Sequence, residues 1–486
     1  MGRVLENLQP EKVFYYFEEI SKIPRGSGNE KQISDYMVQF AQSLNLEVRQ
    51  DEAHNIYIRK PATPGYENVP TVILQGHMDM VCEKNKNTEH DFEKEGIKLV
   101  VENDFIHAEG TTLGADNGVA IAYQMAILAD DTLEHPAIEA LMTTAEETGM
   151  DGVANLHPEY LQGKVLLNLD TDIEGEFLVS CAGGAKVHVA LPVSYESAPN
   201  AHIRYRLTVK GLTGGHSGAD IHKERANAHI LIGRMLDRIR CEMPVYLASF
   251  VGGTKDNVIT REAEVSFYIA QQHTVVLEKI VEEMKQAFQI EYAKQDPGLQ
   301  VILTTEQGEK EVLSLEHTEK VIDLLMLLPH GIMAYSMQIE GLVESSLNIG
   351  VVQLEKDQFH IVLAVRSSVP TKKENMIRKI KCVSRNLGAE VTVNGDYPAW
   401  VYAPQSRIRD LAVEVFEHMY HKQPKIEAIH AGLECGFILE KIPGIDMIAF
   451  GPNAYDIHSP EERVSISSMA RVYAYLTTLL KEMKNY

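Results

Sequence analysis

The sequence is poor in cysteine and contains no long apolar run. Only five cysteines occur in 486 residues, and no two of them form a CxxC pair. So sparse and odd a set is typical of reduced thiols and argues against a disulfide framework. No stretch approaches the roughly 18 apolar residues that a membrane helix needs, and the N-terminus lacks the pattern of a secretory signal. We therefore expect a cytoplasmic protein that does not act at a membrane.

Positive charge is also scarce. The chain has 46 lysines and arginines against 69 acidic residues, which gives a net charge of −23. This balance argues against a nucleic-acid-binding groove. Its simplest interpretation is solubility, although part of the acidic excess could be carboxylates that hold cations. Hydrophobic and charged contents of 44% and 24% are those of a globular protein, and the length predicts two or three domains.

The order of apolar patterns predicts an α/β domain that an insertion divides. Strand-like runs such as NIYIRK, PTVILQ, IEALMTT and KVLLNLD alternate with helical runs until about Val189. This alternation is typical of a mixed, mainly parallel sheet covered by helices. The same alternation of strand-like and helical runs returns after Tyr397. We therefore assign residues 1–187 and 397–486 to one catalytic domain.

The intervening residues, 188–396, have a different texture. Their first half reads as a βαββα unit, and a looser version of the same pattern follows. We therefore predict an inserted α+β lid domain built from a duplicated sheet-plus-helices unit. Sequence identity between the two halves is weak.

Imidazole and carboxylate side chains follow the predicted strands at several places. Strand ends in an open α/β sheet border the functional crevice, so these side chains are expected at one rim. They are His77 and Asp79 after VILQ, Glu146 and Glu147 after ALMTTA, Asp170 after VLLNL, Asp116 in the loop LGADNG before a helix, and His458 after MIAFG.

This inventory suits a pair of metal ions. Two cations about 3.5–4 Å apart need imidazole and carboxylate ligands, with one carboxylate bridging both. Such a pair lowers the pKa of a shared water, which helps amide hydrolysis at neutral pH. Each motif alone is weak, because HxD after a strand is more often structural and an EE pair more often faces solvent. Their joint placement carries the prediction.

The motifs GHMDMV, TTLGADNG, TTAEETGMDG, NLDTD, CAGG, LTGGHSG, HAGLECG and HSPEE closely resemble the M20 family of metallopeptidases, and within it the bacterial aminoacyl-histidine dipeptidases. The resemblance covers nearly the whole chain. It implies two Zn²⁺ ions per chain, which Mn²⁺ or Co²⁺ could replace. The implied zinc ligands are His77, Asp116, Glu147, Asp170 and His458.

The resemblance also implies individual roles near the metals. Asp116 bridges, Glu146 is the general base that activates the bridging water, and Asp79 holds the imidazole of His77. Consecutive Glu146 and Glu147 cannot face the same way on an extended strand, so the chain must turn there.

In the insertion, the resemblance implies that His216 stabilises the oxyanion and that Asn257, Arg366 and Gly432 contact substrate. Arg366 offers the planar fork that a free α-carboxylate prefers. Without the resemblance, His216 would be an ordinary loop histidine and Arg366 a surface arginine on an edge strand. The lid would close over the substrate and exclude longer peptides.

Other candidates receive structural interpretations. We expect His430 to be structural rather than a sixth ligand, and Glu434 to help shape the nearby pocket. Four histidines are expected in loops and exposed to solvent: His90, His107, His135 and His157.

The sequence thus predicts a dipeptidase for unblocked dipeptides, preferring C-terminal histidine and including β-alanyl-histidine. Two alternatives stay open: an M20 deacylase or carboxypeptidase, and a non-catalytic zinc-binding assembly protein on a decayed site. The complete ligand set argues against decay. We expect no nucleic-acid partner. Both a homodimer through the lid and a duplicated lid that replaces a partner remain possible.

Overall fold

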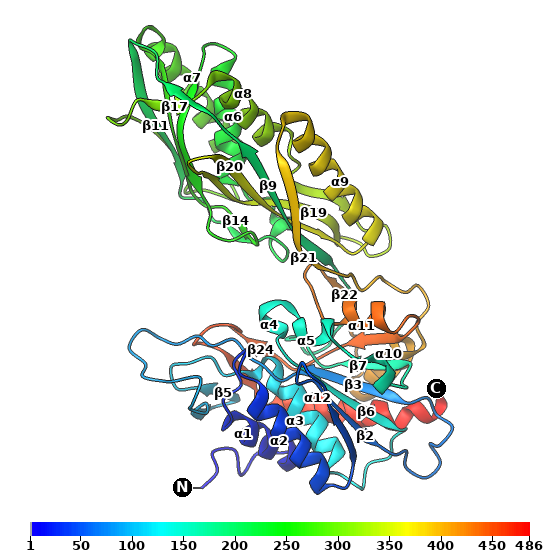
Figure 1. Cartoon of the computed structure of the whole chain (residues 1–486). Coiled ribbons are helices and arrows are strands. Elements are labelled where there is room, and N and C mark those ends of the chain that lie inside the picture. The colour runs from blue at the N-terminus through cyan, green and yellow to red at the C-terminus, as the bar shows by residue number, and fades with distance from the viewer. Residues whose placement is uncertain (1) are drawn as a thin grey trace. The chain divides into compact units, whose positions relative to one another are not determined.

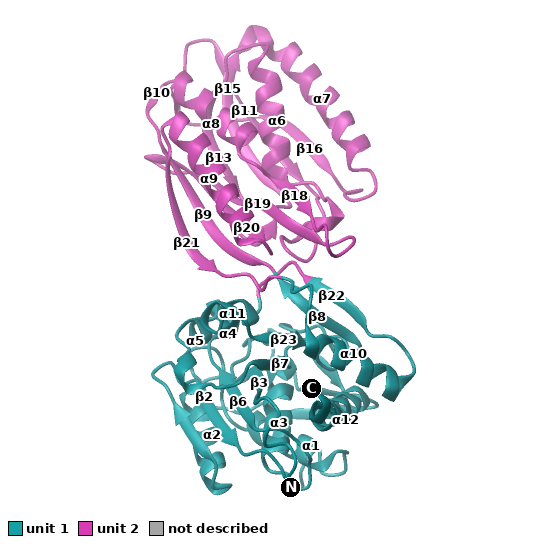
Figure 2. Ribbon diagram, turned by 90° about the vertical axis from the view of Figure 1, so that its right-hand side faces the viewer, with its two compact units in different colours: residues 1–181, 402–428, 433–486 teal, residues 182–401, 429–432 magenta. Residues whose placement is uncertain are grey.

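The computed structural model describes residues 2–486 (Figure 1). The chain divides into two compact units (Figure 2). Unit 1 contains the residues up to Cys181 together with Tyr402–Ala428 and Leu433–Tyr486, and unit 2 contains Ala182–Val401 and Ile429–Gly432. The unit boundaries lie a few residues from those that the sequence predicts, and the short return of Ile429–Gly432 to unit 2 was not predicted.

An eight-stranded mixed sheet forms the centre of unit 1. Strand β3 pairs in parallel with both β6 and β7, β7 pairs in parallel with β23, and the pairs β1–β2, β2–β6 and β8–β23 are antiparallel. This is the mixed α/β architecture that the sequence predicts, with its three parallel pairs at the centre and three antiparallel pairs flanking them. Parallel pairing therefore does not predominate among these six pairs, contrary to the expectation of a mainly parallel sheet. The strands, in sheet order, are β1 (Glu47–Gln50), β2 (Ile56–Lys60), β6 (Ile138–Thr143), β3 (Val72–His77), β7 (Val165–Asn168), β23 (Asp446–Ala449), β8 (Glu176–Cys181) and β22 (Lys425–Ile429).

The three central strands β3, β6 and β7 are buried along their whole length. Such continuous apolar runs are expected where helices cover both faces of a sheet. Helix α3 is buried on nearly every side, because its sequence is apolar all round. The helices of unit 1 are α1 (Glu11–Ser21), α2 (Lys31–Ser43), α3 (Ala115–Leu128), α4 (Glu146–Gly149), α5 (Asp151–Ala154), α10 (Arg407–Tyr420), α11 (Cys435–Lys441) and α12 (Ile466–Glu482).

A smaller four-stranded sheet also belongs to unit 1. It joins an early hairpin to a late segment of the chain, since β25 pairs with β5. Its strands, in order, are β24 (Ala454–Tyr455), β25 (Arg463–Ser465), β5 (Phe105–Ala108) and β4 (Leu99–Glu102).

Unit 2 is built on a nine-stranded sheet whose pairings are all antiparallel. The order β11–α6–β13–β15–α7 is followed by α8–β19–β20–α9–β21, and the β13–β19 pair joins these halves into one sheet. The strands, in sheet order, are β16 (Gln300–Thr305), β11 (His202–Lys210), β15 (Ala263–Ala270), β13 (Tyr246–Gly252), β19 (Val343–Leu354), β20 (Gln358–Ser367), β9 (Gly183–Pro192) and β21 (Glu390–Tyr397), with β18 (Gly331–Tyr335) beside β19.

Four helices cover one face of this sheet (Figure 2). Alternate residues of β20, including Phe359, Ile361 and Leu363, belong to the resulting core. The helices are α6 (Ala228–Arg240), α7 (Thr274–Glu291), α8 (Leu315–Leu327) and α9 (Pro370–Leu387). Two small pairs complete the unit: β10 (Tyr195–Ser197) with β17 (Glu311–Leu313), and β12 (Gly215–His216) with β14 (Val258–Ile259).

The expectation that four histidines lie in loops and are solvent-exposed is wrong for three of them: His90 and His135 are buried, and His107 lies on strand β5 rather than in a loop. His135 is buried, and its Nδ1 lies 2.7 Å from the carbonyl oxygen of Pro136. His90 is buried with its ring edge-on to Phe92. Loop position alone does not report burial, because these loops fold back onto the domain. Within the described part of the chain, no helix is both long and apolar enough to cross a membrane.

Candidate metal centre

Parallel pairing brings three chemistry-bearing strand ends together. Strand β3 ends at His77 and lies between β6, which ends just before Glu146 and Glu147, and β7, which ends two residues before Asp170. Their carboxyl ends therefore share one edge of the sheet.

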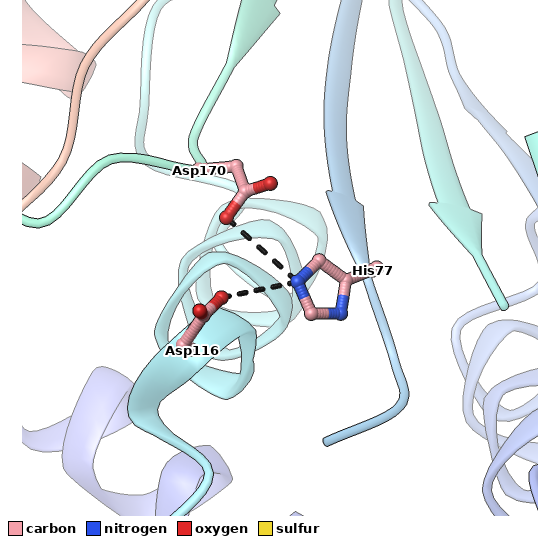
Figure 3. Close-up of side chains that lie close together, drawn as sticks. All are labelled: His77, Asp116 and Asp170. Atoms are coloured by element: carbon pink, nitrogen blue, oxygen red, sulfur yellow. Dashed lines mark hydrogen bonds and ion pairs between the residues drawn. The ribbon is translucent and has the colours of Figure 1, made fainter. Parts of the chain in front are cut away.

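His77 is the centre of the first group (Figure 3). Its Nε2 lies 3.1 Å from Asp116 Oδ1 and 3.7 Å from Asp170 Oδ1. Asp116 comes from the first turn of α3 and Asp170 from the loop after β7, so three elements converge on one imidazole nitrogen.

Asp116 also faces a second histidine. Its other oxygen, Oδ2, lies 3.2 Å from His458 Nε2, and that nitrogen is 3.0 Å from Glu147 Oε2. Each oxygen of Asp116 thus faces a different histidine. His458 has a left-handed backbone with φ of 62°, which is uncommon outside glycine and is typical of residues that a site holds in place.

The chain turns between β6 and the two glutamates. Ala145 has φ of 53°, and α4 starts at Glu146, so the turn expected on steric grounds is present. The fully buried Asp79 fixes it: its Oδ1 accepts from the Glu146 backbone N–H at 3.1 Å and its Oδ2 from that of Glu147 at 3.3 Å. Asp79 Oδ1 also lies 3.3 Å from His77 Nδ1.

The carboxylates control the charge of both histidines. Burial would lower the pKa of His77, but Asp170, Asp116 and Asp79 outweigh it and raise that pKa well above its usual value. Hydrogen bonds to Asp116 and Glu147 raise the pKa of His458 to about 10. The two imidazoles lower the pKa of Asp116 in spite of its burial.

Two further carboxyl groups of the cluster have raised pKa values. Burial raises the pKa of Asp170 well above its usual value, with Asp116 and Glu146 adding to the effect. Burial raises the pKa of Glu146 to about 8, helped by Glu434 and Glu147. So many carboxylates in one buried cluster repel one another.

This cluster fits divalent cations. Among residues 2–486, Asp116, Glu147 and Asp170 form ion pairs only with histidines, so no lysine or arginine neutralises them. Glu147 Oε1 is buried without a hydrogen-bond partner, a position that a cation would satisfy. Three groups have ligand atoms within 4.8 Å of one another: His77–Asp116–Asp170, His77–Glu146–Glu147 and Asp116–Glu147–His458.

A buried polar network beneath this edge was not predicted in detail. Glu434 is fully buried, and its Oε2 accepts from Gln75 Nε2 at 2.5 Å and from Thr143 Oγ1 at 2.6 Å. Gln75 in turn accepts from Asn168 Nδ2, and Asn168 accepts from the backbone N–H of Asp170. The network therefore joins β3, β6 and β7 just below the candidate ligands.

Two other buried residues of the site were missed. Glu462 accepts backbone N–H bonds from the loop that leads into Asp116, and Arg25 donates to the carbonyl oxygen of Gly114 in that loop. Glu462 stands in the motif HSPEE, which was the available signal, whereas nothing in the turn IPRGSG marked Arg25.

The sequence-predicted residues of unit 2 form a cluster of their own. His216 Nδ1 accepts from the backbone N–H groups of Gly218 and Ala219, at 3.3 and 3.0 Å. The imidazole proton must then sit on Nε2, which lies 3.5 Å from Arg366 Nη2. Burial and Arg366 lower the pKa of His216. A neutral N–H and a guanidinium thus share one space, an arrangement suited to an anionic group.

Arg366 is not the surface arginine of the alternative interpretation. It lies on β20, between β19 and β9, and is 9% exposed. Its Nη1 donates to Tyr397 Oη at 2.8 Å. No sequence signal pointed to Tyr397.

The other candidates of unit 2 come from segments that are distant in sequence from His216 and Arg366. Asn257 accepts through its backbone oxygen from Ser217 N–H at 2.8 Å, beside His216. His430 Nε2 lies 2.7 Å from Ser346 Oγ, and no candidate metal group among the described residues includes His430. Gly432 follows on the same short segment, Ile429–Gly432.

Comparison with known proteins agrees with this geometry. The model of peptidase family M20/M25/M40 matches residues 73–482. The chain is 37% identical to the cytosol non-specific dipeptidase of Escherichia coli over 479 residues, which cover 99% of each chain. It is similar to the crystal structure of aminoacylhistidine dipeptidase from Vibrio alginolyticus, with a TM-score of 0.92, 35% identity and 98% coverage of both chains. The aminopeptidase PepT of Bacillus cereus shares the fold, with a TM-score of 0.57, 18% identity and coverage of 98% of this chain and 99% of that chain.

Proposed function

Because the chain belongs to peptidase family M20/M25/M40 and is therefore a metallopeptidase, we propose that it hydrolyses unblocked dipeptides. We propose a preference for C-terminal histidine, with β-alanyl-histidine among the substrates. The names of the Escherichia coli and Vibrio alginolyticus relatives support this substrate class. We further propose a cytosolic location, in line with the name of the first relative and with the small number of scattered cysteines in the sequence.

The placement of Asp116 is the observation that carries the proposal. Its two carboxylate oxygens face His77 and His458 at 3.1 and 3.2 Å, as a carboxylate shared by two cations requires. We propose that Asp170 completes the His77 side and Glu147 the His458 side. Zn²⁺ suits these imidazole and carboxylate ligands, and Mn²⁺ or Co²⁺ could replace it.

Two cations bound there would supply Lewis acidity, which polarises the peptide carbonyl and makes water more acidic. Glu146 is the proposed proton carrier. Its carboxylate accepts a proton from the attacking water and then gives it to the leaving amine nitrogen as the C–N bond breaks. Asp79 supports this role, since it holds the Glu146 backbone N–H and the His77 imidazole together.

The donors of unit 2 are proposed to bind the anionic parts of the substrate. Arg366 would bind the free α-carboxylate, because a guanidinium fork matches its two oxygens. The neutral His216 would donate from Nε2 to the oxygen that becomes negative as water attacks. Substrate contacts of Asn257 and Gly432, and a homodimer through this unit, stay predictions.

The test measures hydrolysis of a matched panel by purified protein. β-Alanyl-histidine and other Xaa-His dipeptides are compared with N-acetyl amino acids, C-terminally amidated dipeptides and tripeptides. Each is assayed after chelation and after restoring Zn²⁺, Mn²⁺ or Co²⁺. Glu146→Gln, purified identically, controls for peptidases of the expression host.

We expect the free dipeptides to be cleaved, activity to vanish on chelation, and a divalent ion to restore it. Metal affinity should fall as pH falls, because the ligands take up protons. Cleavage of N-acetyl amino acids alone would favour the deacylase alternative. Full activity in verified metal-free protein would refute the metal site.

A further inference from the structure

The two glutamates of HSPEE are neighbours with opposite surroundings. Glu461 is exposed, whereas Glu462 is 2% exposed. The buried carboxylate accepts from the backbone N–H groups of Leu113 at 2.7 Å, Gly114 at 3.0 Å and Ala115 at 2.8 Å. The N–H of the next residue, Asp116, lies 3.4 Å away. The proposed mechanism uses His458 from this motif but neither glutamate.

Arg25 holds the same loop through its carbonyl groups. Its Nη2 donates to the Gly114 carbonyl oxygen at 2.5 Å, and its Nη1 donates to that of Met78 at 3.0 Å, next to His77. Arg25 is 2% exposed and comes from a third part of the chain. Gly114 therefore has its N–H bound by a buried anion and its C=O by a buried cation.

The loop leaves no space for a different residue at this point. Gly114 has φ of 71°, the left-handed region that favours glycine. A Cβ there would lie 2.5 Å from Arg25 Nη2 and 2.7 Å from Met80 Sδ. The left-handed backbone of Gly114, without a Cβ, thus lets both Glu462 and Arg25 approach this residue closely.

Glu462 links two candidate ligands of the metal centre. It lies four residues after His458 in the same segment, and its hydrogen bonds hold the loop that ends at Asp116. We propose that Glu462, with Arg25 on the other side, is a positioning residue that sets the orientation in which Asp116 presents one oxygen to each metal position. This inference rests on the two-metal site of the proposed function.

A carboxylate is the group that this geometry needs. Several N–H donors converge on its two oxygens, and an amide offers only one acceptor oxygen. In Glu462→Gln the NH₂ group would therefore face N–H donors and leave them unsatisfied. The loop should move, and Asp116 with it. In Glu462→Asp the carboxylate is kept but its reach is shorter, so part of the effect should be recovered.

The experiment compares Glu462→Gln with Glu461→Gln, a matched control one residue away. Full-length proteins are loaded with Mn²⁺, and three quantities are measured. These are the affinity of each site by competition with a chelating dye, the exchange-coupled EPR signal of two bridged Mn²⁺ ions, and kcat and KM at saturating Mn²⁺. Circular dichroism and thermal unfolding check that each variant is folded.

We expect Glu461→Gln to match the wild type. Glu462→Gln should bind at least one metal roughly 10–100-fold more weakly, the usual effect of losing a group that orients a ligand. Its coupled EPR signal should be altered even at saturating metal, kcat should fall more than KM rises, and Glu462→Asp should lie between the two. A general loss of stability would not change the coupling between bound ions.

Unchanged affinity and unchanged coupling in folded Glu462→Gln would overturn the proposal. If Glu462→Gln does not fold, the test uses Glu462→Asp and Arg25→Lys instead. Wild-type metal affinity and wild-type coupling in both of these variants would equally overturn the proposal. A wild-type protein that binds only one Mn²⁺, or two without coupling, would instead refute the two-metal site itself.

Discussion

The histidines of the two candidate site clusters, one in each unit, have opposite surroundings. In unit 1, His77 and His458 lie among carboxylates, which raise the pKa of both imidazoles. In unit 2, the half-buried His216 and the buried His430 lie near Arg366. Burial and the guanidinium lower the pKa of both, that of His430 to about 3.

The contrast shows that surroundings, rather than residue type, set the charge and the ligand of a histidine. The candidate metal centre of unit 1 concentrates negative charge on Asp116, Glu147 and Asp170, whose ion pairs are with histidines, so it is suited to cations. Unit 2 presents neutral N–H groups and a guanidinium, so it is suited to an anion. One unit has the chemistry to hold metal, and the other has the chemistry to hold a carboxylate.

The largest expected effect comes from a substitution in the carboxylate cluster of unit 1. Glu146→Gln keeps the shape of the side chain but removes the proton acceptor. Its turnover should fall roughly 10²–10⁴-fold, or about 3–5 kcal/mol of barrier. Bound metal, measured by elemental analysis, should stay at the wild-type level.

The adjacent Glu147→Gln is the matched control for that change. Its carboxylate contacts His458 at 3.0 Å and has a buried, unpartnered oxygen. It should lose metal from one site, with activity partly recovered at high Zn²⁺. If Glu146→Gln loses the metal while Glu147→Gln keeps it without turnover, the two roles are reversed.

A smaller effect is expected from a substitution in the proposed anion-binding cluster of unit 2. Arg366→Ala removes the guanidinium proposed to bind the substrate carboxylate. Binding of free dipeptides should weaken by roughly 2–5 kcal/mol, the cost of truncating one partner of a buried charge pair. Steady-state kinetics on Xaa-His substrates measure this as a rise in KM.

Amidated dipeptides separate recognition from structure in this variant. They lack the carboxylate, so they should be poor substrates of the wild type and lose little more in Arg366→Ala. Equal losses for free and amidated dipeptides would mean that Arg366 acts only structurally, through contacts such as its bond to Tyr397.

The smallest expected effect is a pH dependence of stability that comes from a buried histidine of unit 2. His229 is fully buried in α6, and burial lowers its pKa to about 4. In the unfolded chain this histidine has a pKa near 6.5. As pH falls, the unfolded state therefore takes up a proton at a higher pH than the folded state does. The stability contributed by neutral His229 is complete above pH 6.5 and is lost as pH falls toward 4. The loss should be roughly 2 kcal/mol at pH 5.

Urea unfolding of wild type and His229→Gln at pH 7 and pH 5 measures this contribution. The variant cannot take up the proton, so its stability should decline less between the two pH values. Hydrogen exchange should locate the difference in unit 2. Identical pH dependence in both proteins would contradict the assignment.

The sequence predicted best the features that depend on strand order. His77, Glu147 and Asp170 end or follow neighbouring apolar strands, and parallel pairing brings such ends together. The interruption of the α/β pattern likewise marked the insertion. The turn at Ala145 could be expected because two adjacent side chains cannot share one face of a strand.

Two of the residues that the sequence did not reveal, Glu462 and Arg25, act through backbone groups far away in the chain. Glu462 binds N–H groups of residues about 350 positions earlier, and Arg25 binds the carbonyl of Gly114. Neither contact leaves a periodic pattern, because the partner is a peptide group that every residue has.

The position of β23 in the middle of the unit 1 sheet has a consequence for synthesis of the protein. This strand lies between β7 and β8, although it comes from Asp446–Ala449, and both His458 and Glu462 follow it. Domains usually fold as units, the N-terminal one first, as the chain leaves the ribosome. Here, the first part of the chain cannot complete its sheet or its metal centre until the last segment is made. Chains truncated before β23 should therefore have no peptidase activity.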